Sequence, residues 1–313
     1  MMKFKCCFQA IFFAFIFSGM MLTSESIGDP KTDEIAKPVM LATGFTFPEG
    51  PVLDKDGNLY LVNFRATMIH KVSPDGKVSV VVDIGAFNNG AIFDRVGNLF
   101  IASSGLKAIL KLDRKGELSV VTAVSEGDSL LGPNDFAWDN EGRLYFTDPR
   151  GSGKNNLIGG IHFIGRDGVT RRFAGGLSYP NGIAFDLDKT HVYVSETGSD
   201  RIVRFAVNPD GSAGEKELLY ELPDRSVPDG IKLDVKGNLW VAVHSKGELW
   251  RISPEGVKID SIKLPSKLVT NLTFGGADMR TMYVTCPEDW VSETGKVYTL
   301  RVPVAGVPVI PKE

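Results

Sequence analysis

The sequence is poor in cysteine and histidine, and this scarcity limits the chemistry that it can perform. Its 313 residues include three cysteines and four histidines. Cys6 and Cys7 stand near the N-terminus, so only Cys286 belongs to the body of the chain. A disulfide framework is therefore excluded there, and a large hydrophobic core does not need one. A zinc site built from cysteine and histidine in the usual way is not expected either.

The sequence also lacks a strong net charge, sustained helical periodicity and a serine-nucleophile motif. Its formal net charge is −3, which gives no reason to expect nucleic acid or an anionic membrane surface as a partner. No stretch shows a sustained 3.6-residue period, so we expect very little helix. Gly-x-Ser-x-Gly is absent, and no histidine-containing triad can be assembled from the sequence. A serine hydrolase is therefore disfavoured.

The first 26 residues have the layout of a secretory signal peptide. Lys3 and Lys5 precede an apolar stretch over 6–22, and a small polar segment follows over 23–26. The apolar stretch is short for a membrane span, which needs about 20 residues, and an uncleaved anchor is the alternative. We predict a signal peptide over 1–26, a polar linker over 27–37 and one domain over 38–313. The protein would be exported, to the periplasm or the medium, without stable membrane association after cleavage.

A repeated unit fills the rest of the chain. Each copy begins with a polar residue, continues through a short apolar run, and then in its clearest forms reads Asp-x-x-Gly-Asn-Leu-aromatic, as in 49–60 and 229–240. We call the first polar residue of each copy the opener, and the six openers are Glu49, Asn89, Asn134, Asn181, Asp229 and Asn271. They are spaced about 40 to 48 residues apart, and repeats of this length filled with short strands are typical of β-propeller blades.

The repeats predict an all-β fold: a six-bladed β-propeller with four-stranded antiparallel blades. The opener begins the first strand, and glycine turns join the first strand to the second and the third to the fourth. The sixth repeat lacks a fourth strand, which we expect the segment 39–42 to supply, so that an N-terminal strand closes the ring. Because successive strands alternate in direction, the six openers should meet at one mouth of the central channel.

Four openers follow a proline, which fixes the backbone geometry as the chain enters the channel. They are Glu49, Asn134, Asn181 and Asp229. Pro-Asn-Gly and Pro-Asp-Gly also form ordinary turns, but glutamate has no such turn preference, and four matching positions favour a site. Two carboxylates and two amides suit a hard divalent cation, first Ca²⁺ and then Mg²⁺ or Mn²⁺, with Zn²⁺ less well matched.

On these landmarks the chain resembles the senescence marker protein/gluconolactonase family, which includes regucalcin. The resemblance covers residues 38 to about 306. It implies a six-bladed propeller that hydrolyses lactones or related esters at one divalent ion. It also implies that Glu49, Asn181 and Asp229 hold the metal, that Asn134 contacts metal or substrate, and that Asp229 transfers the proton. A cation polarises a carbonyl, and a carboxylate beside it can carry the proton.

One position departs from this resemblance. Sugar-lactone members often carry an arginine two residues before the position of Asn134, whereas this chain has Gly132. The departure disfavours a polyhydroxylated lactone as substrate. Arg65 or Arg150, each on a predicted rim loop, is an alternative cationic group. His244, on the loop beside the Asp229 strand, is a further candidate substrate contact.

Other polar residues are predicted to have structural roles. Asn89 and Asn271 are expected to support the site, and Asp148 to cap a turn, with a second ion as the alternative. The remaining histidines are read as structural: His70, His162 and His191. Three functions stay open: a lactonase, a phosphotriester or aryl-ester hydrolase at the same ion, and a non-catalytic binding propeller with a structural ion. The expected partner is a small lactone or ester, with no nucleic acid.

Overall fold

The computed structural model describes residues 35–310. The predicted signal peptide (1–26) and most of the predicted linker (27–37) lie outside these residues, so both stay predictions. The described residues form strands β1 to β26 and two 3₁₀ turns, η1 (Thr197–Ser199) and η2 (His244–Lys246). Among them no helix is both long enough and apolar enough to cross a membrane. The expected near-absence of helix is confirmed for the described part of the chain.

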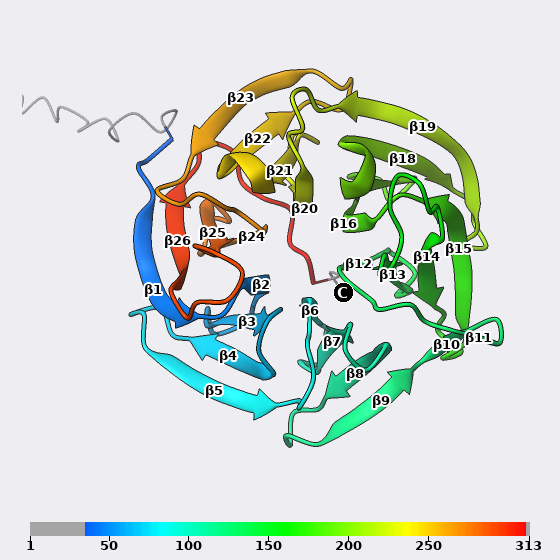
Figure 1. Ribbon diagram of the computed structural model, residues 1–313, viewed down its shortest axis with the longest axis horizontal. Helices are drawn as coiled ribbons and strands as arrows, with labels where there is room; N and C mark the ends of the chain where they lie inside the picture. Colours follow the sequence, from blue (N-terminus) through cyan, green and yellow to red (C-terminus); the bar gives the residue numbers. More distant parts are fainter. Residues whose placement is uncertain (1–34, 311–313) are drawn as a thin grey trace, which may run out of the picture. The chain divides into compact units, whose positions relative to one another are not determined.

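Six sheets of four antiparallel strands are arranged in a ring, and each sheet is one blade (Figure 1). Blade 1 comprises β2 (Pro48–Leu53), β3 (Leu59–Asn63), β4 (Met68–Val72) and β5 (Val78–Asp83). Blade 2 comprises β6 (Gly90–Phe93), β7 (Leu99–Ser103), β8 (Ala108–Leu112) and β9 (Leu118–Thr122). Blade 3 comprises β12 (Phe136–Trp138), β13 (Leu144–Asp148), β14 (Gly159–Ile164) and β15 (Thr170–Leu177). The predicted six-bladed propeller is confirmed.

The second half of the ring repeats the pattern. Blade 4 comprises β16 (Pro180–Phe185), β17 (His191–Glu196), β18 (Arg201–Val207) and β19 (Ala213–Glu221). Blade 5 comprises β20 (Pro228–Leu233), β21 (Leu239–Val243), β22 (Glu248–Ile252) and β23 (Lys258–Lys263). Blade 6 comprises β24 (Asn271–Gly275), β25 (Thr281–Cys286), β26 (Gly295–Arg301) and β1 (Val39–Phe45). A hairpin that the repeat did not predict, β10 (Val124–Ser125) with β11 (Asp128–Ser129), precedes blade 3.

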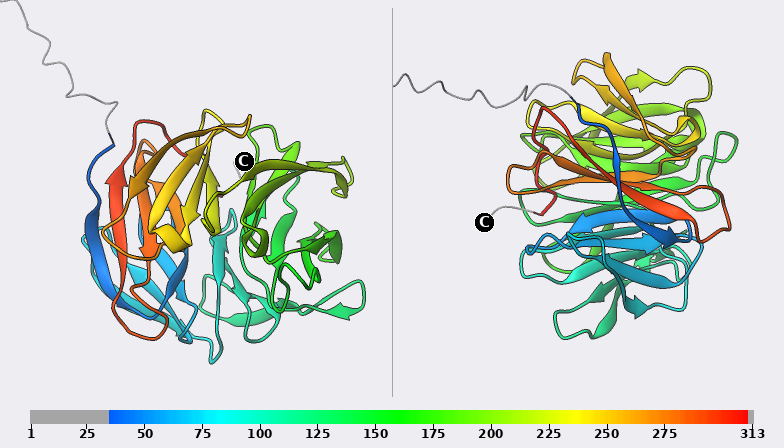
Figure 2. Two further views of the ribbon diagram at one scale, coloured as in Figure 1. Left: turned by 45° about the horizontal axis from the view of Figure 1, so that its top comes forward. Right: turned by 90° about the vertical axis from the view of Figure 1, so that its left-hand side faces the viewer.

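The N-terminal strand closes the ring. In both views of Figure 2, β1 lies along β26, and the two pair antiparallel from Val39 opposite Thr299 to Phe45 opposite Gly295. The predicted segment 39–42 is confirmed, and the strand runs three residues further, to Phe45. Joining the first and last parts of the chain in one sheet removes an open edge, which would otherwise be free to pair with another chain.

The glycine turns form as the repeated motif predicts. The Asp54 carboxylate accepts hydrogen bonds from the backbone N–H groups of Asp56 and Asn58, both at 2.9 Å. Equivalent bonds link Asp94 to the backbone of Asn98. An aspartate that bonds its own following backbone stabilises a tight turn locally. This local stabilisation explains why the motif recurs at the same place in successive blades.

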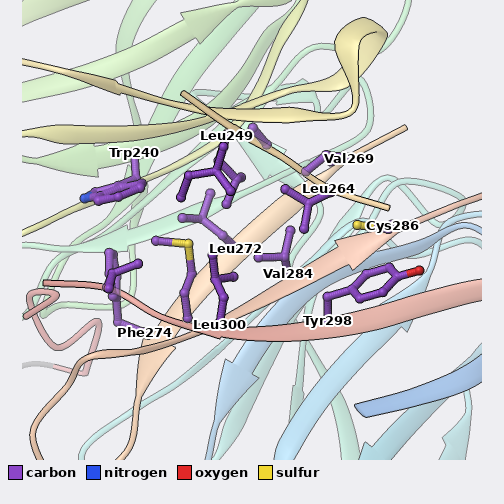
Figure 3. Close-up of a cluster of buried hydrophobic side chains, with 14 residues drawn as sticks. Trp240, Leu249, Leu264, Val269, Leu272, Phe274, Val284, Cys286, Tyr298 and Leu300 are labelled. Atoms are coloured by element: carbon purple, nitrogen blue, oxygen red, sulfur yellow. The ribbon is translucent and has the colours of Figure 1, made fainter. Parts of the chain in front are cut away.

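The core lies between blades rather than in one central mass. The inner strand β16 is buried along its whole length, whereas the outer strand β5 is largely exposed. Figure 3 shows the cluster that joins blades 5 and 6, where Trp240 and Leu249 face Leu272 and Val284. Cys286 also lies in this cluster, and burial raises the pKa of its thiol. It is therefore a core residue without thiolate character.

The inner strands approach one another closely around the channel. A Cβ atom at Gly90 would overlap the backbone carbonyl of Asn134, and one at Gly182 would overlap that of Asp229. Hydroxyl groups join neighbouring blades at the same level: Thr147 donates to the Asn181 carbonyl and Ser195 to the Asp229 carbonyl, both at 2.7 Å. Glycine after the opener therefore permits the contact that brings the openers together.

The segment after β26 lies over the mouth of the channel opposite the openers. In Figure 1 this red segment runs toward the centre of the ring. Val307 N–H donates to the Leu233 carbonyl, and Val235 N–H donates to the Ala305 carbonyl, both at 2.9 Å. Val309 lines a small cavity inside the channel together with Asp135 and Lys232. The channel is thus covered at this end.

Candidate metal and substrate site

All six openers are buried at the inner ends of their blades. The pairing of inner and second strands is irregular at or directly after three of them, Glu49, Asn181 and Asp229. A local irregularity in a strand re-aims a side chain relative to regular pairing. Asn271 shows no such shift, since β24 pairs regularly with β25 from this residue onward. The backbone thus distinguishes the three openers that the resemblance assigned to the metal from Asn271.

The carboxylates of Glu49 and Asp229 lie within each other's field. Burial raises the pKa of Glu49 to about 8, and the nearby charge of Asp135 adds to this. The pKa of Asp229 is raised well above its ordinary value. Burial is the largest cause, and the charges of Glu49 and Asp135 raise it further. Like charges brought together in a water-poor site disfavour ionisation unless a cation neutralises them. The cluster is therefore electrostatically suited to a cation.

Amide groups of two other openers support these carboxylates. Hydrogen bonding from the Asn271 side chain and from the Gly50 backbone N–H, at 3.0 Å, partly offsets the raised pKa of Glu49. Hydrogen bonding from the Asn181 side chain does the same for Asp229. Asn271 thus acts on the Glu49 carboxylate, and the supporting role expected for it stays a prediction.

The two carboxylate oxygens of Asp229 have different surroundings. Its Oδ1 atom is buried and has no hydrogen-bond partner among the described residues. The other oxygen, Oδ2, lies 3.6 Å from His244 Nδ1. A buried carboxylate oxygen without a partner is unfavourable unless a ligand fills the place. Together with the oxygen-rich donor set of the openers, this atom makes the residues present fit a hard divalent cation.

Asn134 and Asn89 are fixed through their backbones. Asn134 N–H donates to the Thr147 carbonyl at 2.8 Å, and Asn89 N–H donates to the Ala102 carbonyl at 2.9 Å. Both side chains are buried at the level of the other openers. The predicted ligand or substrate role of Asn134 and the supporting role of Asn89 stay predictions.

Asp135 and Lys232 form an ion pair in the channel that the sequence reading missed. Lys232 Nζ lies 3.2 Å from Asp135 Oδ2, and both side chains are nearly fully buried. The repeat contained a signal for each. Asp135 stands where four other repeats have glycine after the opener, and Lys232 is a single charge where the other repeats carry Val, Ile, Ala or Phe. A buried charge is rarely tolerated without a partner, so these two positions could have been paired in advance.

The predicted rim residues His244 and Arg65 lie beside an aromatic group. His244 Nδ1 is 3.2 Å from the Val269 carbonyl, and burial lowers the pKa of its imidazole, so the ring is neutral at pH 7. The centroid of the His244 ring is 5.9 Å from those of Phe47 and Trp290. The Arg65 guanidinium lies 5.3 Å from the Trp290 ring centroid. Phe47 and Trp290 were not predicted from the sequence.

Tyr179 is a further residue of this mouth. The pKa of its phenol is raised to about 12. Burial is the largest cause, and the charges of Asp229 and Glu49 add to it. Arg150 and Arg65 act on it in the opposite direction. Tyr179 therefore lies within the electrostatic field of both the channel carboxylates and the two arginines. Tyr179 precedes Pro180 just as Phe47 precedes Pro48. Comparing the repeats for an aromatic residue before the proline could therefore have identified both residues from the sequence.

Asp148 caps a loop, as the sequence reading preferred. Its carboxylate accepts hydrogen bonds from the N–H groups of Leu131, at 2.8 Å, and Gly132, at 2.6 Å. His162 Nδ1 lies 2.8 Å from Ser125 Oγ, and its Nε2 lies 3.7 Å from Asp148 Oδ2. This serine, histidine and aspartate are all buried, and burial lowers the pKa of His162 to about 4. The group fixes the loop that leads to Asn134 and does not present a nucleophile to solvent.

Fold and site together define a six-bladed β-propeller with a buried cluster of carboxylate and amide side chains at one mouth of its channel. The chain belongs to the SMP-30/Gluconolactonase/LRE-like family, whose model matches residues 47–287. The resemblance drawn from the sequence is therefore confirmed at the level of the family.

Named relatives are consistent with this assignment. The 6-deoxy-6-sulfogluconolactonase of Pseudomonas putida is 35% identical over 144 residues, which are 42% of this chain and 49% of that protein. Regucalcin of Bos taurus is 30% identical over 151 residues, which are 47% of this chain and 50% of that protein. The chain thus matches about half the length of these two relatives. The structure of a gluconolactonase from Xanthomonas campestris has a TM-score of 0.75 and 26% identity, covering 86% of this chain and 90% of that one.

Proposed function

We propose that this protein is a divalent-cation-dependent lactonase that opens a cyclic ester by hydrolysis. The observation that carries the proposal is the buried Oδ1 of Asp229, which has no hydrogen-bond partner in the described part of the chain, beside the carboxylate of Glu49. The family supports it, since relatives in this family are named lactonases. The fit of carboxylate and amide oxygens to a hard ion makes Ca²⁺ the first candidate, ahead of Mg²⁺, Mn²⁺ and Zn²⁺.

In this proposal Glu49, Asn181 and Asp229 hold the cation, and Asn134 contacts the cation or the substrate. When bound, a divalent ion supplies Lewis acidity toward an ester carbonyl and lowers the pKa of water. The Oδ1 atom of Asp229, which has no hydrogen-bond partner among residues 35–310, would be available to hold the ion. The other oxygen, Oδ2, accepts the proton of the attacking water and returns it to the ring oxygen as the ester bond breaks.

His244 has a supporting place in this scheme. The imidazole lies 3.6 Å from Asp229 Oδ2, and its Nδ1–H is directed to the Val269 carbonyl. A neutral imidazole held in this way keeps its orientation beside the proton-transferring oxygen. It contacts the substrate at the channel mouth, and Arg65 lies further out on the rim.

Export of the mature protein is part of the proposal. It rests on the basic, apolar and small polar segments of residues 1–26. N-terminal sequencing of protein recovered from the periplasm or the medium tests it. A start near residue 27 is expected, whereas intact residues 1–26 on an exported or membrane-held product would contradict cleavage.

The decisive experiment is a metal add-back assay. Mature protein stripped with chelator receives Ca²⁺, Mg²⁺, Mn²⁺ or Zn²⁺ and is assayed on a panel of lactones, aryl esters and a phosphotriester, with cation binding measured separately by calorimetry. We expect lactone hydrolysis to return most fully with Ca²⁺. Faster turnover of aryl esters or phosphotriesters would favour the alternative hydrolase. Cation binding without turnover of any substrate would favour the non-catalytic binding propeller.

A further inference from the structure

The mouth of the channel carries a stacked aromatic pair. The ring centroids of Phe47 and Trp290 are 4.5 Å apart with an interplanar angle of 23°. Phe47 is buried, whereas Trp290 is 50% exposed on the loop between β25 and β26. An offset-stacked pair with one ring open to solvent presents a flat apolar surface. A half-exposed tryptophan beside a ligand site also indicates a contact for a ligand.

This aromatic pair lies next to the carboxylate cluster. Phe47 is followed by Pro48 and Glu49, so its backbone is continuous with that of a proposed metal ligand. The His244 ring, 5.9 Å from each aromatic ring, approaches Asp229 through its Nδ1 atom. A substrate whose ester group reaches the carboxylates would therefore bring its substituent against the pair.

The backbone is strained to present these aromatic side chains. Phe47 has a φ of 56° and Tyr179 a φ of 50°, in the left-handed region that bulky residues rarely adopt. Backbone hydrogen bonds hold both residues: Phe64 N–H donates to the Phe47 carbonyl at 2.9 Å, and Thr197 N–H donates to the Tyr179 carbonyl at 3.1 Å. Strain retained at equivalent places of two blades, beside a cluster of buried carboxylates, is typical of functional sites.

The position before the proline has the same apolar character in the four proline-led blades. These positions are occupied by Phe47, Gly132, Tyr179 and Val227. None is basic, and only the phenol of Tyr179 has a polar side-chain atom. Arg150 packs its aliphatic part over Gly132 while its Nη1 donates to the Ser104 carbonyl at 2.6 Å. One donor of its guanidinium is thus already bonded to the protein backbone.

We propose that Phe47 and Trp290, with Tyr179 opposite, form a subsite for an apolar substituent of the substrate. The preferred substrates are then aryl- or alkyl-substituted lactones, not polyhydroxylated sugar lactones. The inference rests on the proposed lactonase function and names the substrate class of the same site. Phe47 and Trp290 act as specificity-determining residues and take no part in proton transfer.

Kinetics with a matched substrate pair test the inference. Wild-type protein with Ca²⁺ is assayed on a phenyl-substituted δ-valerolactone and on gluconolactone. We expect kcat/KM to be at least about tenfold higher for the phenyl lactone. Trp290→Ala should raise KM for that lactone about tenfold with kcat changed less than about twofold, as expected when an aromatic contact is lost. Trp290→Phe should keep the KM for the phenyl lactone close to that of the wild-type protein.

Matched controls separate this subsite from a general effect on the loop. Val291→Ala changes the neighbouring residue, which is 82% exposed, and should leave both substrates unaffected. A preference for gluconolactone in the wild-type protein would overturn the inference. Equal losses on both substrates in Trp290→Ala would also overturn it, because the tryptophan would then serve the fold of the loop.

A binding measurement keeps the inference separate from the lactonase function. The phenyl-substituted δ-lactam, which resists hydrolysis, is titrated against wild-type and Trp290→Ala protein by tryptophan fluorescence and calorimetry, with gluconolactam in parallel. Selective binding of the phenyl lactam that weakens about tenfold in Trp290→Ala supports the subsite even where no lactone is hydrolysed. Absent phenyl-lactam binding, or gluconolactam binding of equal strength, overturns the subsite even where lactones are hydrolysed.

Discussion

Lys232 and Asp135 form a buried ion pair inside the channel, with 3.2 Å between Nζ and Oδ2. Strand β20 also carries Asp229, and Asp135 is adjacent to Asn134, so the pair lies directly behind two openers. Asp135 raises the pKa of Glu49 and Lys232 lowers it. One fixed positive charge therefore balances one of the three carboxylates, and two remain to neutralise a divalent ion.

Removal of the positive charge of Lys232 should destabilise the protein chiefly when no cation is bound. Lys232→Met leaves Asp135 buried without its partner, and loss of one member of a buried pair typically costs about 3 to 5 kcal/mol. We expect the free energy of unfolding in EDTA to fall by roughly that amount. Adding Ca²⁺ should then increase the free energy of unfolding more in Lys232→Met than in the wild-type protein. Urea unfolding with and without Ca²⁺ measures this.

The double variant Lys232→Met with Asp135→Asn is the matched comparison. It removes both charges together and should be less destabilised than Lys232→Met alone, because no unpaired charge is left in the channel. If the single variant were as stable as the wild-type protein in EDTA, the ion pair would have no such role.

Asp229→Asn should abolish turnover more completely than cation binding. The amide keeps an oxygen that can face the ion but cannot accept a proton. General acid–base groups contribute about 10²- to 10⁴-fold, so we expect kcat to fall by at least about a hundredfold. Calorimetric Ca²⁺ titration should show weakened but measurable binding. Asp56→Asn, at an exposed turn, serves as the charge-matched control. Unchanged turnover in Asp229→Asn would refute the proton-transfer role.

The cation-free protein should lose stability as the pH rises from about 5 to 8. The pKa of Glu49 is raised from 4.5 to about 8, so the folded state binds a proton that the unfolded state has already released in this range. When the folded state binds more protons, the free energy of unfolding falls as the pH increases. Denaturant unfolding in EDTA across this range measures the slope, and saturating Ca²⁺ should reduce it.

Glu49→Gln provides the control for this pH dependence. The amide does not titrate, so the decline between pH 5 and pH 8 in EDTA should become shallower. An identical slope in the variant and the wild-type protein would show that other groups cause the decline. Calcium affinity of the wild-type protein should also rise with pH over the same range, because protons and the cation compete for Glu49.

Close approach of the inner strands predicts a steric effect at Gly182. A Cβ atom there would overlap the Asp229 carbonyl and lie 2.6 Å from the Ile231 amide nitrogen. Gly182→Ala should therefore lower the free energy of unfolding by about 1 to 3 kcal/mol, as overpacking does, and weaken cation binding by displacing Asp229. Gly153→Ala meets no atom within 4 Å and should be neutral. Thermal unfolding and Ca²⁺ titration of both variants test this, and an unperturbed Gly182→Ala would contradict it.

Much of the fold could be predicted because its signals are local. In several glycine turns an aspartate bonds backbone groups two and four residues ahead, as Asp54 does with Asp56 and Asn58. Alternating apolar residues then extend from that turn in both directions. Even the closing strand was predictable, since the sixth repeat visibly lacked its fourth strand. The hairpin β10–β11 was not, because it stands outside the repeat.

The candidate site was predictable in part. The six openers could be found from their spacing, and all are buried around the channel. Their contacts could not be found in the same way. Asp135 and Lys232 are 97 residues apart, and Phe47 and Trp290 come from opposite ends of the propeller sequence. The roles assigned to Glu49, Asn134, Asn181 and Asp229 remain predictions for the experiments above.

The sequence by itself determined the number of blades, the place of each turn and the row of openers, since each follows from interactions among residues a few positions apart. Only the tertiary structure decided which openers share an electrostatic field, which oxygen of Asp229 has no partner among residues 35–310, and which aromatic rings stand beside it. These features depend on how neighbouring blades meet across the channel. Burial and charge act through space, so the pKa values and contacts of these residues depend on others that are far away in the sequence.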